Sequence, residues 1–386
     1  MCGEPLPLPA GEHLVSLPDE KQSPKLITLD EPVWTTPQSH AGLIWFISDT
    51  GVLYSLASRG ERPAALTVLG AEFGRSSWLI TRDKSGGQDA DAIVVASPKS
   101  AVMVDMATGE KRTLYACRDG EALVVDTSKV HVGLAEAGDS FYFMGSLSGQ
   151  PALARVGRDG TSDFFALKEA DEAIGPVVLD QYVLAFSKKW VYSLHQGNVK
   201  RAQWYGGFDP DMRFEVTRAR TFKPPFGQLP FFRTRHGVMV LGTRAGRPAL
   251  ALVSGIAEDG PNTSLWPVDR EEGFFAVAPG GQVLVLNRAG VHTFEQGQLV
   301  LLRRDALAVP MTAPYHDGTT TVLTVGGSTS GRHIRMYGGS GYPEDFALAP
   351  YDDYCQGMAF LPCSGDLVHA YCTDDMKARF LVWRTQ

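Results

Sequence analysis

Acidic residues in predicted turns are the first candidates for chemistry in this sequence. Asp83, Asp89 and Asp91 surround the glycine-rich stretch SGGQ, and carboxylates on such a loop can bind calcium. Their spacing matches no EF-hand, so a solvated loop is the simpler interpretation. Other acids could serve as general acid and base if they converge and one pKa rises, the alternative being a solvated acidic rim. These are Glu169, Asp171 and Glu172; Glu271 and Glu272; and Asp352 and Asp353.

Established catalytic and metal-binding motifs are not matched. The strings nearest to a nucleophile elbow, GSLSG (145–149) and GSTSG (327–331), have Leu147 and Thr329 where the motif requires serine. No phosphate loop, dinucleotide fingerprint or HExxH is found. His40, His236 and His316 fall in corresponding turns of different repeats, too far apart for metal–ligand distances of about 2 Å. The sequence therefore predicts no cofactor and no metal, and leaves enzymatic activity open.

Repeated short strands must position these residues. An apolar hexad recurs about every 46 residues, the spacing of a four-stranded repeat of roughly 40–50 residues. Because each hexad is apolar throughout, it predicts a strand buried on both faces. We call this strand b; strand a precedes it, and strands c and d follow after tight turns. The hexads are LIWFIS (43–48), AIVVAS (92–97), FYFMGS (141–146), YVLAFS (182–187), VMVLGT (238–243), VLVLNR (283–288), VLTVGG (322–327) and LVHAYC (367–372).

This pattern resembles the β-propeller superfamily over residues 24–386. The resemblance implies an all-β fold in which residues 1–386 form a single domain, an eight-bladed propeller, with seven blades as the alternative. The last repeat lacks strand d, and PKLITLD (24–30) is predicted to supply it by pairing with 380–385. Such closure would remove exposed sheet edges. Residues 1–23 would then form an N-terminal extension.

Signatures of individual propeller families are incomplete. The GH…WD signature of WD40 repeats is missing, MVDMATGEKR (103–112) resembles a quinoprotein-type turn once, and SDTG (48–51) resembles a sialidase Asp-box once. The degenerate repeats are also similar to those of bacterial propellers encoded beside MoxR-type ATPases and von Willebrand A proteins.

Composition and charge restrict the cellular setting. A net charge of −7 argues against bulk binding to nucleic acid or acidic membranes. No apolar stretch approaches the roughly 20 residues of a membrane span, and the N-terminus has no signal-peptide pattern. The five cysteines are an odd number and include no CxxC pair, which favours a reduced, cytoplasmic chain. A disulfide between Cys363 and Cys372 is the alternative.

Charged residues divide between two sets of turns. Turns from strand d to the next strand a carry the acids named above and predict an acidic mouth near the axis. The b–c turns carry more bases than acids, which predicts a basic ring that could steer a partner of mixed charge, the alternative being dispersed charge on solvated turns. The bases are Lys99, Lys188, Lys189, Arg244, Arg247, Arg332, Lys377 and Arg379; the acids are Asp49, Asp374 and Asp375.

One predicted connection, residues 205–228, is unusually long. Long connections in compact domains are commonly functional, and this one combines four phenylalanines with four basic residues, a composition typical of interface hot spots. The alternative is a loop that packs against its own blades.

These observations favour a non-catalytic scaffold within a multiprotein complex, with protein partners of unknown identity and an open oligomeric state. The alternatives are a hydrolase or lyase with acids at the axial mouth, or a ligand or glycan sensor. The predicted partner-binding residues are Phe208, Arg213, Phe214, Arg218, Arg220, Phe222, Lys223, Lys188, Lys189, Arg244 and Arg247.

Overall fold

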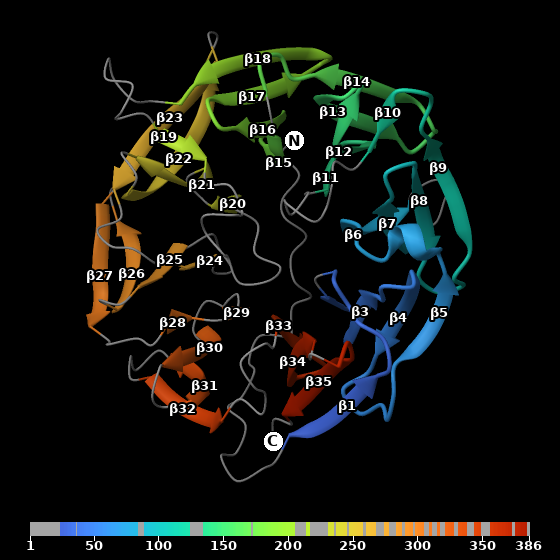
Figure 1. Cartoon of the computed structure of the whole chain (residues 1–386), viewed down its shortest axis with the longest axis vertical. Helices are drawn as coiled ribbons and strands as arrows, with labels where there is room; N and C mark the ends of the chain where they lie inside the picture. The colour runs from blue at the N-terminus through green and yellow to red at the C-terminus, as the bar shows by residue number, and fades with distance from the viewer. Residues whose placement is uncertain are drawn as a thin grey trace. The chain divides into compact units, whose positions relative to one another are not determined.

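In the computed structural model, nearly all the secondary structure of the described residues is antiparallel β-strand (Figure 1). A one-turn 3₁₀ helix, Ala71–Phe73, is the only helix in the part of the chain that is described, so no described helix could span a bilayer. The described residues are 24–35, 37–83, 89–123, 134–170, 173–204, 214–216, 231–234, 237–244, 247–257, 260–267, 274–277, 283–287, 290–295, 298–304, 309–310, 315–316, 321–327, 331–337, 343–348, 356–372 and 375–383.

The chain divides into two units. Unit 1 comprises residues 1–74, 224–228 and 272–386, and its described residues form four sheets. In chain order from strand a to d they are β2 (Gln38–His40), β3 (Leu43–Ile47), β4 (Val52–Leu56) and β5 (Ala64–Val68); β24 (Phe274–Val277), β25 (Val283–Asn287), β26 (Gly290–Glu295) and β27 (Gln298–Arg304); β28 (Val309–Pro310) with β29 (Tyr315–His316), β30 (Thr321–Gly327), β31 (Gly331–Tyr337) and β32 (Pro343–Leu348); and β33 (Gln356–Cys363), β34 (Asp366–Cys372), β35 (Ala378–Trp383) and β1 (Lys25–Leu29).

Unit 2 comprises residues 75–223 and 229–271 and forms four further sheets of the same order. They are β6 (Trp78–Asp83), β7 (Ala90–Ala96), β8 (Ser100–Asp105) and β9 (Lys111–Ala116); β10 (Glu121–Ala122) with β11 (Leu134–Ala137), β12 (Ser140–Leu147), β13 (Gln150–Gly157) and β14 (Ser162–Ala166); β15 (Ala173–Leu179), β16 (Tyr182–Ser187), β17 (Trp190–His195) and β18 (Asn198–Gln203); and β19 (Phe214–Val216) with β20 (Phe231–Thr234), β21 (Gly237–Arg244), β22 (Arg247–Ala257) and β23 (Gly260–Pro267).

Every predicted hexad lies in the second strand of a sheet. In β3, β7 and β16 nearly every residue is buried, as the continuous apolar pattern predicts. In unit 1 the ring of Phe46 in β3 lies 4.8 Å from that of Phe380 in β35, so two neighbouring sheets share one core. In unit 2, Phe186 of β16 similarly contacts Phe231 of β20, with ring centroids 5.5 Å apart. Each fully buried aromatic side chain contributes about 2–3 kcal/mol to folding.

Serine at the end of the hexad shapes the b–c turn. The Ser97 hydroxyl accepts hydrogen bonds from the backbone N–H groups of Lys99 and Ser100, at 3.3 and 3.1 Å. The Ser187 hydroxyl accepts one from the Trp190 N–H at 3.1 Å. Both serines are buried. A hydroxyl that satisfies backbone donors within a turn holds it in one conformation, so the residues at the tip are presented on a fixed backbone.

The two ends of the described chain meet in one sheet of unit 1. Residues 24–30 are predicted to pair with 380–385, and the structure pairs β1 with β35 in antiparallel register, with Ile27 opposite Phe380.

The Glu31 carboxylate accepts hydrogen bonds from the Tyr54 hydroxyl at 2.6 Å and from Thr50. These hydrogen bonds lower the pKa of Glu31, and burial together with the carboxylate raises the pKa of Tyr54 to about 12.

Two details differ from the sequence-based expectation. The stretch 205–228 is not a continuous loop, because it contains β19, which pairs with the end of β21. The alternative of a Cys363–Cys372 disulfide is wrong, because both thiols are free and buried. The strand register places Cys363 opposite Asp366 and Cys372 opposite Gln356, at opposite ends of the β33–β34 hairpin.

A buried histidine gives the C-terminal sheet a dependence on pH. His369 in β34 is fully buried, and its ring stacks against Tyr371 and Trp383, with centroids 5.4 and 6.5 Å away. Burial lowers the pKa of His369 from its ordinary value of 6.5 to about 3. The folded state therefore excludes a proton that the unfolded chain binds below pH 6.5.

We predict that the His369 contribution to stability is complete above pH 6.5 and is lost progressively as the pH falls towards 3. Its slope should be about 1.4 kcal/mol per pH unit. The variant His369→Phe keeps the stacked rings and should lack this slope in urea unfolding measured between pH 6 and 4. The control, His195→Phe, changes a ring that solvent reaches and should keep the wild-type slope. Equal slopes for His369→Phe and the wild type would contradict the prediction.

Candidate interaction surface

The b–c turn between β16 and β17 presents two lysines. Lys188 and Lys189 are both exposed at its tip. The Ser187 hydrogen bond closes the turn from within, and the Trp204 backbone N–H donates to the Lys189 carbonyl at 3.2 Å. The Trp204 indole Nε1 donates to the Ser187 carbonyl at 2.9 Å from a buried position. The backbone of this turn is therefore fixed on both sides, and both lysines lie on its exposed tip.

The neighbouring d–a linker is fixed by an aromatic and ionic cluster. The Arg201 guanidinium lies 4.3 Å over the Trp190 ring, donates to the Glu169 carboxylate at 2.7 Å and donates to the Lys168 carbonyl at 3.0 Å. The Tyr192 hydroxyl donates to the same carbonyl at 2.8 Å. Lys168 itself is exposed. The linker therefore adds a third lysine to the surface around the β16–β17 turn.

Three predicted partner-binding residues occupy adjacent backbone positions. In the register of the β19–β21–β22 sheet, Arg244 lies opposite both Phe214 and Arg247. Arg244 is half-buried. The backbone pairing thus places Phe214, from the 205–228 stretch, in the same sheet row as Arg244 and Arg247 of the predicted ring. The predicted residues Phe208, Arg213, Arg218, Arg220, Phe222 and Lys223 lie outside the described residues.

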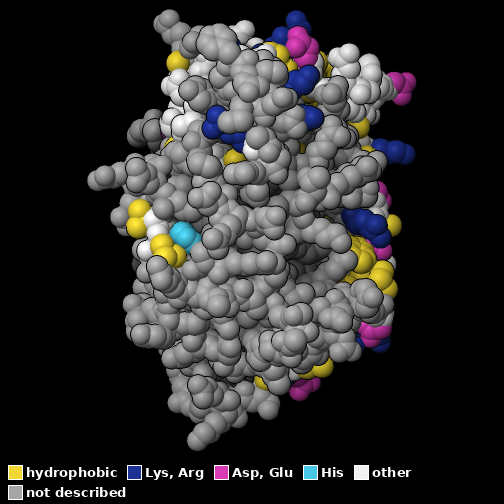
Figure 2. Space-filling view, turned by 60° about the vertical axis from the view of Figure 1, so that its left-hand side comes forward, with side chains coloured by type: hydrophobic (Ala, Val, Ile, Leu, Met, Phe, Trp, Pro, Cys, Tyr) yellow, Lys and Arg dark blue, Asp and Glu magenta, His cyan; other side chains and the backbone are white. Residues whose placement is uncertain are grey.

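Among the residues that the structure describes, bases outnumber acids at the end of the unit 2 sheets that carries the b–c turns and the d–a linkers. Figure 2 shows several Lys and Arg side chains, with some Asp and Glu side chains among them, in the upper part of the view, where Figure 1 draws β14 and β16–β18. We call the end of the unit 2 sheets that is formed by the b–c turns and d–a linkers the basic surface. Its bases among the described residues are Lys99, Arg118, Lys168, Lys188, Lys189, Arg201 and Arg244, and its acids are Asp119, Glu121 and Glu169.

The predicted basic ring does not extend unchanged into unit 1. The Lys377 ammonium forms an ion pair with Asp30 at 2.7 Å, and Arg379 forms one with Asp375 at 3.0 Å. These two bases were expected to add positive charge to the ring, but Lys377 pairs with an acid that follows β1, and Arg379 pairs with an acid of its own b–c turn. The side chain of Arg332 lies outside the described part of the structure.

Several of the acids predicted as catalytic or calcium-binding residues form ion pairs with arginines. The Glu169 carboxylate is bound by Arg201, and the Asp83 carboxylate forms ion pairs with Arg112 at 3.1 Å and Arg158 at 4.0 Å. Asp91 lies 3.9 Å from Arg82. Two of the three carboxylates predicted as calcium ligands, Asp83 and Asp91, thus lie beside arginines, and Asp89 is exposed. Within the described residues, no group of three or more His, Cys, Asp or Glu residues could hold a metal. Asp171, Glu172, Glu271, Glu272, Asp352 and Asp353 lie outside those residues.

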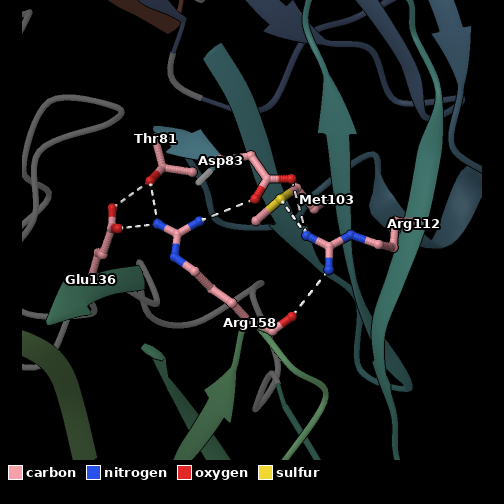
Figure 3. A network of polar contacts seen from close by, with 6 residues as sticks. All are labelled: Thr81, Asp83, Met103, Arg112, Glu136 and Arg158. Atoms are coloured by element: carbon pink, nitrogen blue, oxygen red, sulfur yellow. Dashed lines mark hydrogen bonds and ion pairs between the residues drawn. The ribbon is translucent and has the colours of Figure 1, made fainter. Parts of the chain in front are cut away.

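Arg158 is the centre of a polar network that joins two sheets of unit 2 (Figure 3). It reaches from the turn after β13 to Thr81 of β6 at 3.0 Å, and it also binds the Glu136 carboxylate of β11. The Thr81 hydroxyl donates to Glu136 at 2.6 Å. The guanidinium lies 4.7 Å over the Phe141 ring, and only 10% of the Arg158 side chain is exposed.

Arg112 extends this network from β9. It donates to the Arg158 carbonyl at 3.1 Å and to Asp83 at 3.1 Å, and it lies 3.3 Å from the Met103 sulfur. Two arginines and two carboxylates therefore balance one another across the boundary between the sheets. This arrangement is suited to fixing the two sheets together, because its opposite charges are matched in a partly buried position.

Comparisons with known proteins identify the fold alone. No protein family and no curated protein matches the sequence. BamB from Moraxella catarrhalis is similar with a TM-score of 0.53 and 13% identity, over 93% of this chain and 97% of that chain. A puromycin-hydrolyzing peptidase from Mycobacterium tuberculosis has a TM-score of 0.52 and 16% identity, over 89% of this chain and 58% of that chain. An oligogalacturonate lyase from Vibrio parahaemolyticus has a TM-score of 0.50 and 10% identity, over 96% of this chain and 96% of that chain.

These structures are β-propeller-type proteins, so the chain shares the propeller fold, as its repeats predict. The chain spans 58% of the length of the peptidase. The predicted likeness to propellers of MoxR ATPase and von Willebrand A systems finds no support in these comparisons.

We predict that Arg158→Ala lowers the free energy of unfolding by about 3 kcal/mol, because it leaves partly buried carboxylates without their counter-charge. Arg158→Lys should recover only part of the loss, since an ammonium cannot reproduce the forked contacts of guanidinium. Arg155→Ala is the matched control. Its ion pair with Asp163 is exposed, and its loss should cost less than about 1 kcal/mol. Chemical denaturation measures all three, and equal effects of Arg158→Ala and Arg155→Ala would refute a structural role for the network.

Proposed function

We propose that this protein is a non-catalytic interaction scaffold that binds an acidic segment of a protein partner on the basic surface of unit 2. The observation that carries the proposal is the exposed Lys188–Lys189 pair on a b–c turn whose backbone is held by Ser187 and Trp204. A rigid turn loses little conformational entropy on binding, so its charges are prearranged for a partner.

We further propose that the eight sheets are the blades of one closed propeller located in the cytoplasm. The common strand order of the sheets, the β1–β35 pairing and the similarity to solved propellers support the single ring. The free thiols of Cys117, Cys363 and Cys372 are compatible with a reducing compartment.

The charge of the surface favours an acidic partner. The basic surface carries seven bases and three acids among the described residues, in a chain whose net charge is −7. Such a local reversal of sign accelerates encounter with an oppositely charged segment and selects against basic ones. Because the lysines are solvent-exposed, they would contribute mainly to the association rate and to the salt dependence of binding.

Aromatic residues would supply the apolar part of the contact. Phe214 lies opposite Arg244 in the strand register, Arg244 in turn lies opposite Arg247, and the 205–228 stretch contains three more phenylalanines. Aromatic and arginine side chains together dominate the binding energy of most interfaces, with exposed charges around them. We propose that this stretch forms the centre of the contact and that the lysine turns form its rim.

The test uses the full chain as bait in affinity purification with mass spectrometry, followed by binding measurements on the recovered partner. We predict that Lys188→Glu with Lys189→Glu weakens binding about tenfold or more at low salt, mostly through the association rate. The difference should shrink as salt rises. The melting temperature should stay unchanged, because both side chains are exposed.

The matched control is Arg82→Glu with Lys111→Glu, which makes the same charge change on exposed residues at the opposite end of a unit 2 sheet. This variant should bind as the wild type does. Equal loss in both double variants would indicate a general charge effect, and no loss in the Lys188/Lys189 variant would remove the basic surface from the interface.

A further inference from the structure

We infer that Arg201 and Trp190 form a carboxylate-binding site, which Glu169 of the same chain occupies in this structure. A carboxylate of the acidic partner segment would replace Glu169 there, so the inference deepens the proposed function and rests on it. Arg201 lies in β18, the outer strand of its sheet. Trp190 is the first residue of β17 and directly follows Lys189 of the b–c turn. The site therefore adjoins the turn that the proposed function assigns to the partner.

The Arg201 guanidinium is positioned by two contacts that do not involve Glu169. It lies 4.3 Å from the centroid of the Trp190 ring, and its Nη1 donates to the Lys168 carbonyl at 3.0 Å. The Tyr192 hydroxyl donates to the same carbonyl at 2.8 Å, which fixes the acceptor in turn. A planar guanidinium that stacks on an indole ring is held in a defined orientation. The site would therefore stay arranged after Glu169 had left it.

The Glu169 carboxylate accepts a hydrogen bond from the other terminal nitrogen of Arg201, Nη2, at 2.7 Å. In this pair 62% of the Glu169 side chain and 31% of the Arg201 side chain are exposed. An exposed ion pair contributes little to stability, because water and salt compete for both charges. Only 10% of the Arg158 side chain is exposed in its pair with Glu136. The Arg201 pair is therefore the easier one for an incoming carboxylate to exchange.

The linker backbone does not require a glutamate at this position. The Ala170 N–H donates to the Leu167 carbonyl at 3.2 Å, so residues 167–170 form a turn with Glu169 as its third residue. Glu169 has a φ of 63°, a left-handed conformation that turns usually give to glycine or asparagine. Glycine would suit this backbone but would bring no carboxylate to Arg201. The contact with Arg201 is therefore what the Glu169 side chain adds to the linker.

Occupation of the site by Glu169 would weaken the binding of a partner. The apparent affinity of a ligand falls with the fraction of molecules whose site is open. Removal of the Glu169 carboxylate should therefore strengthen binding by more than the removal of another acid from the basic surface. Asp119 provides the comparison, because it is exposed on the same surface, in the corresponding linker one sheet earlier.

The test measures the binding of a fluorescein-labelled oligoglutamate peptide to the full chain by fluorescence anisotropy at low salt. We expect Glu169→Gln to raise the affinity about fivefold and Asp119→Asn to raise it by less than about twofold. In an Arg201→Gln background, Glu169→Gln should give no more than the Asp119→Asn gain. Glu169→Gly should bind as tightly as Glu169→Gln without a lower melting temperature, because glycine readily adopts the left-handed conformation.

Two results would indicate a general charge effect and overturn the inference: a Glu169→Gln gain no larger than that of Asp119→Asn, or a gain that persists in the Arg201→Gln background. A Glu169→Gln variant that does not bind the peptide would overturn it as well. The proposed function is judged separately, on the recovered partner. If Lys188→Glu with Lys189→Glu leaves partner binding intact while Glu169→Gln still binds the peptide more tightly through Arg201, the proposed function fails and the carboxylate site stands.

Discussion

Burial of strand b on both faces is the constraint on which the rest of the structure depends. A strand such as β7, whose central residues are all buried, cannot be covered by a single neighbouring layer. The contact between Phe46 and Phe380 in unit 1, and that between Phe186 and Phe231 in unit 2, show how an adjacent sheet supplies the second cover. Each sheet therefore needs neighbours, and a sheet at a chain end needs a strand from elsewhere. The pairing of β1 with β35 meets that need.

The same constraint separates stability from recognition along each strand. Since the middle of strand b is committed to the core, its end residues and the turns carry the variable chemistry. Ser97 and Ser187 illustrate the division, because each hydroxyl is buried and fixes a turn whose tip is an exposed lysine. The serine is a structural residue, and the lysine at the tip of the turn is exposed.

The sequence predicts the strands well because continuous apolar runs and their spacing are local signals. All eight hexads lie in strands, and the N-terminal closing strand follows from counting the strands of the last repeat. The short strand β19 could not be predicted, since Phe-Glu-Val has no repeated pattern and is defined only by its partner β21. The buried serines of the turns were a missed signal, for Ser48, Ser97 and Ser187 end their hexads in the same way.

Side-chain partners across sheets are the part that the sequence does not specify. Arg158 meets Thr81, 77 residues earlier, and Lys377 meets Asp30 across nearly the whole chain. Neither contact follows from spacing, because each depends on which strand ends come together in three dimensions. This explains why the predicted calcium ligand Asp83 is an ion-pair partner instead, and why two bases of the predicted ring are neutralised.

The two ends of the unit 2 sheets differ in how their described charges are arranged. At one end, Arg112 and Arg158 are matched by Asp83 and Glu136 in a network that joins two sheets. At the other end, Lys99, Lys188 and Lys189 are exposed on turns whose backbone is held by buried serines. The ion-pair network between the two sheets is partly buried, so removing one partner would leave a desolvated charge without its counter-charge. The network therefore stabilises the fold. Exposed charge contributes little to folding, so the bases on the exposed turns are not needed to explain the stability of the sheets.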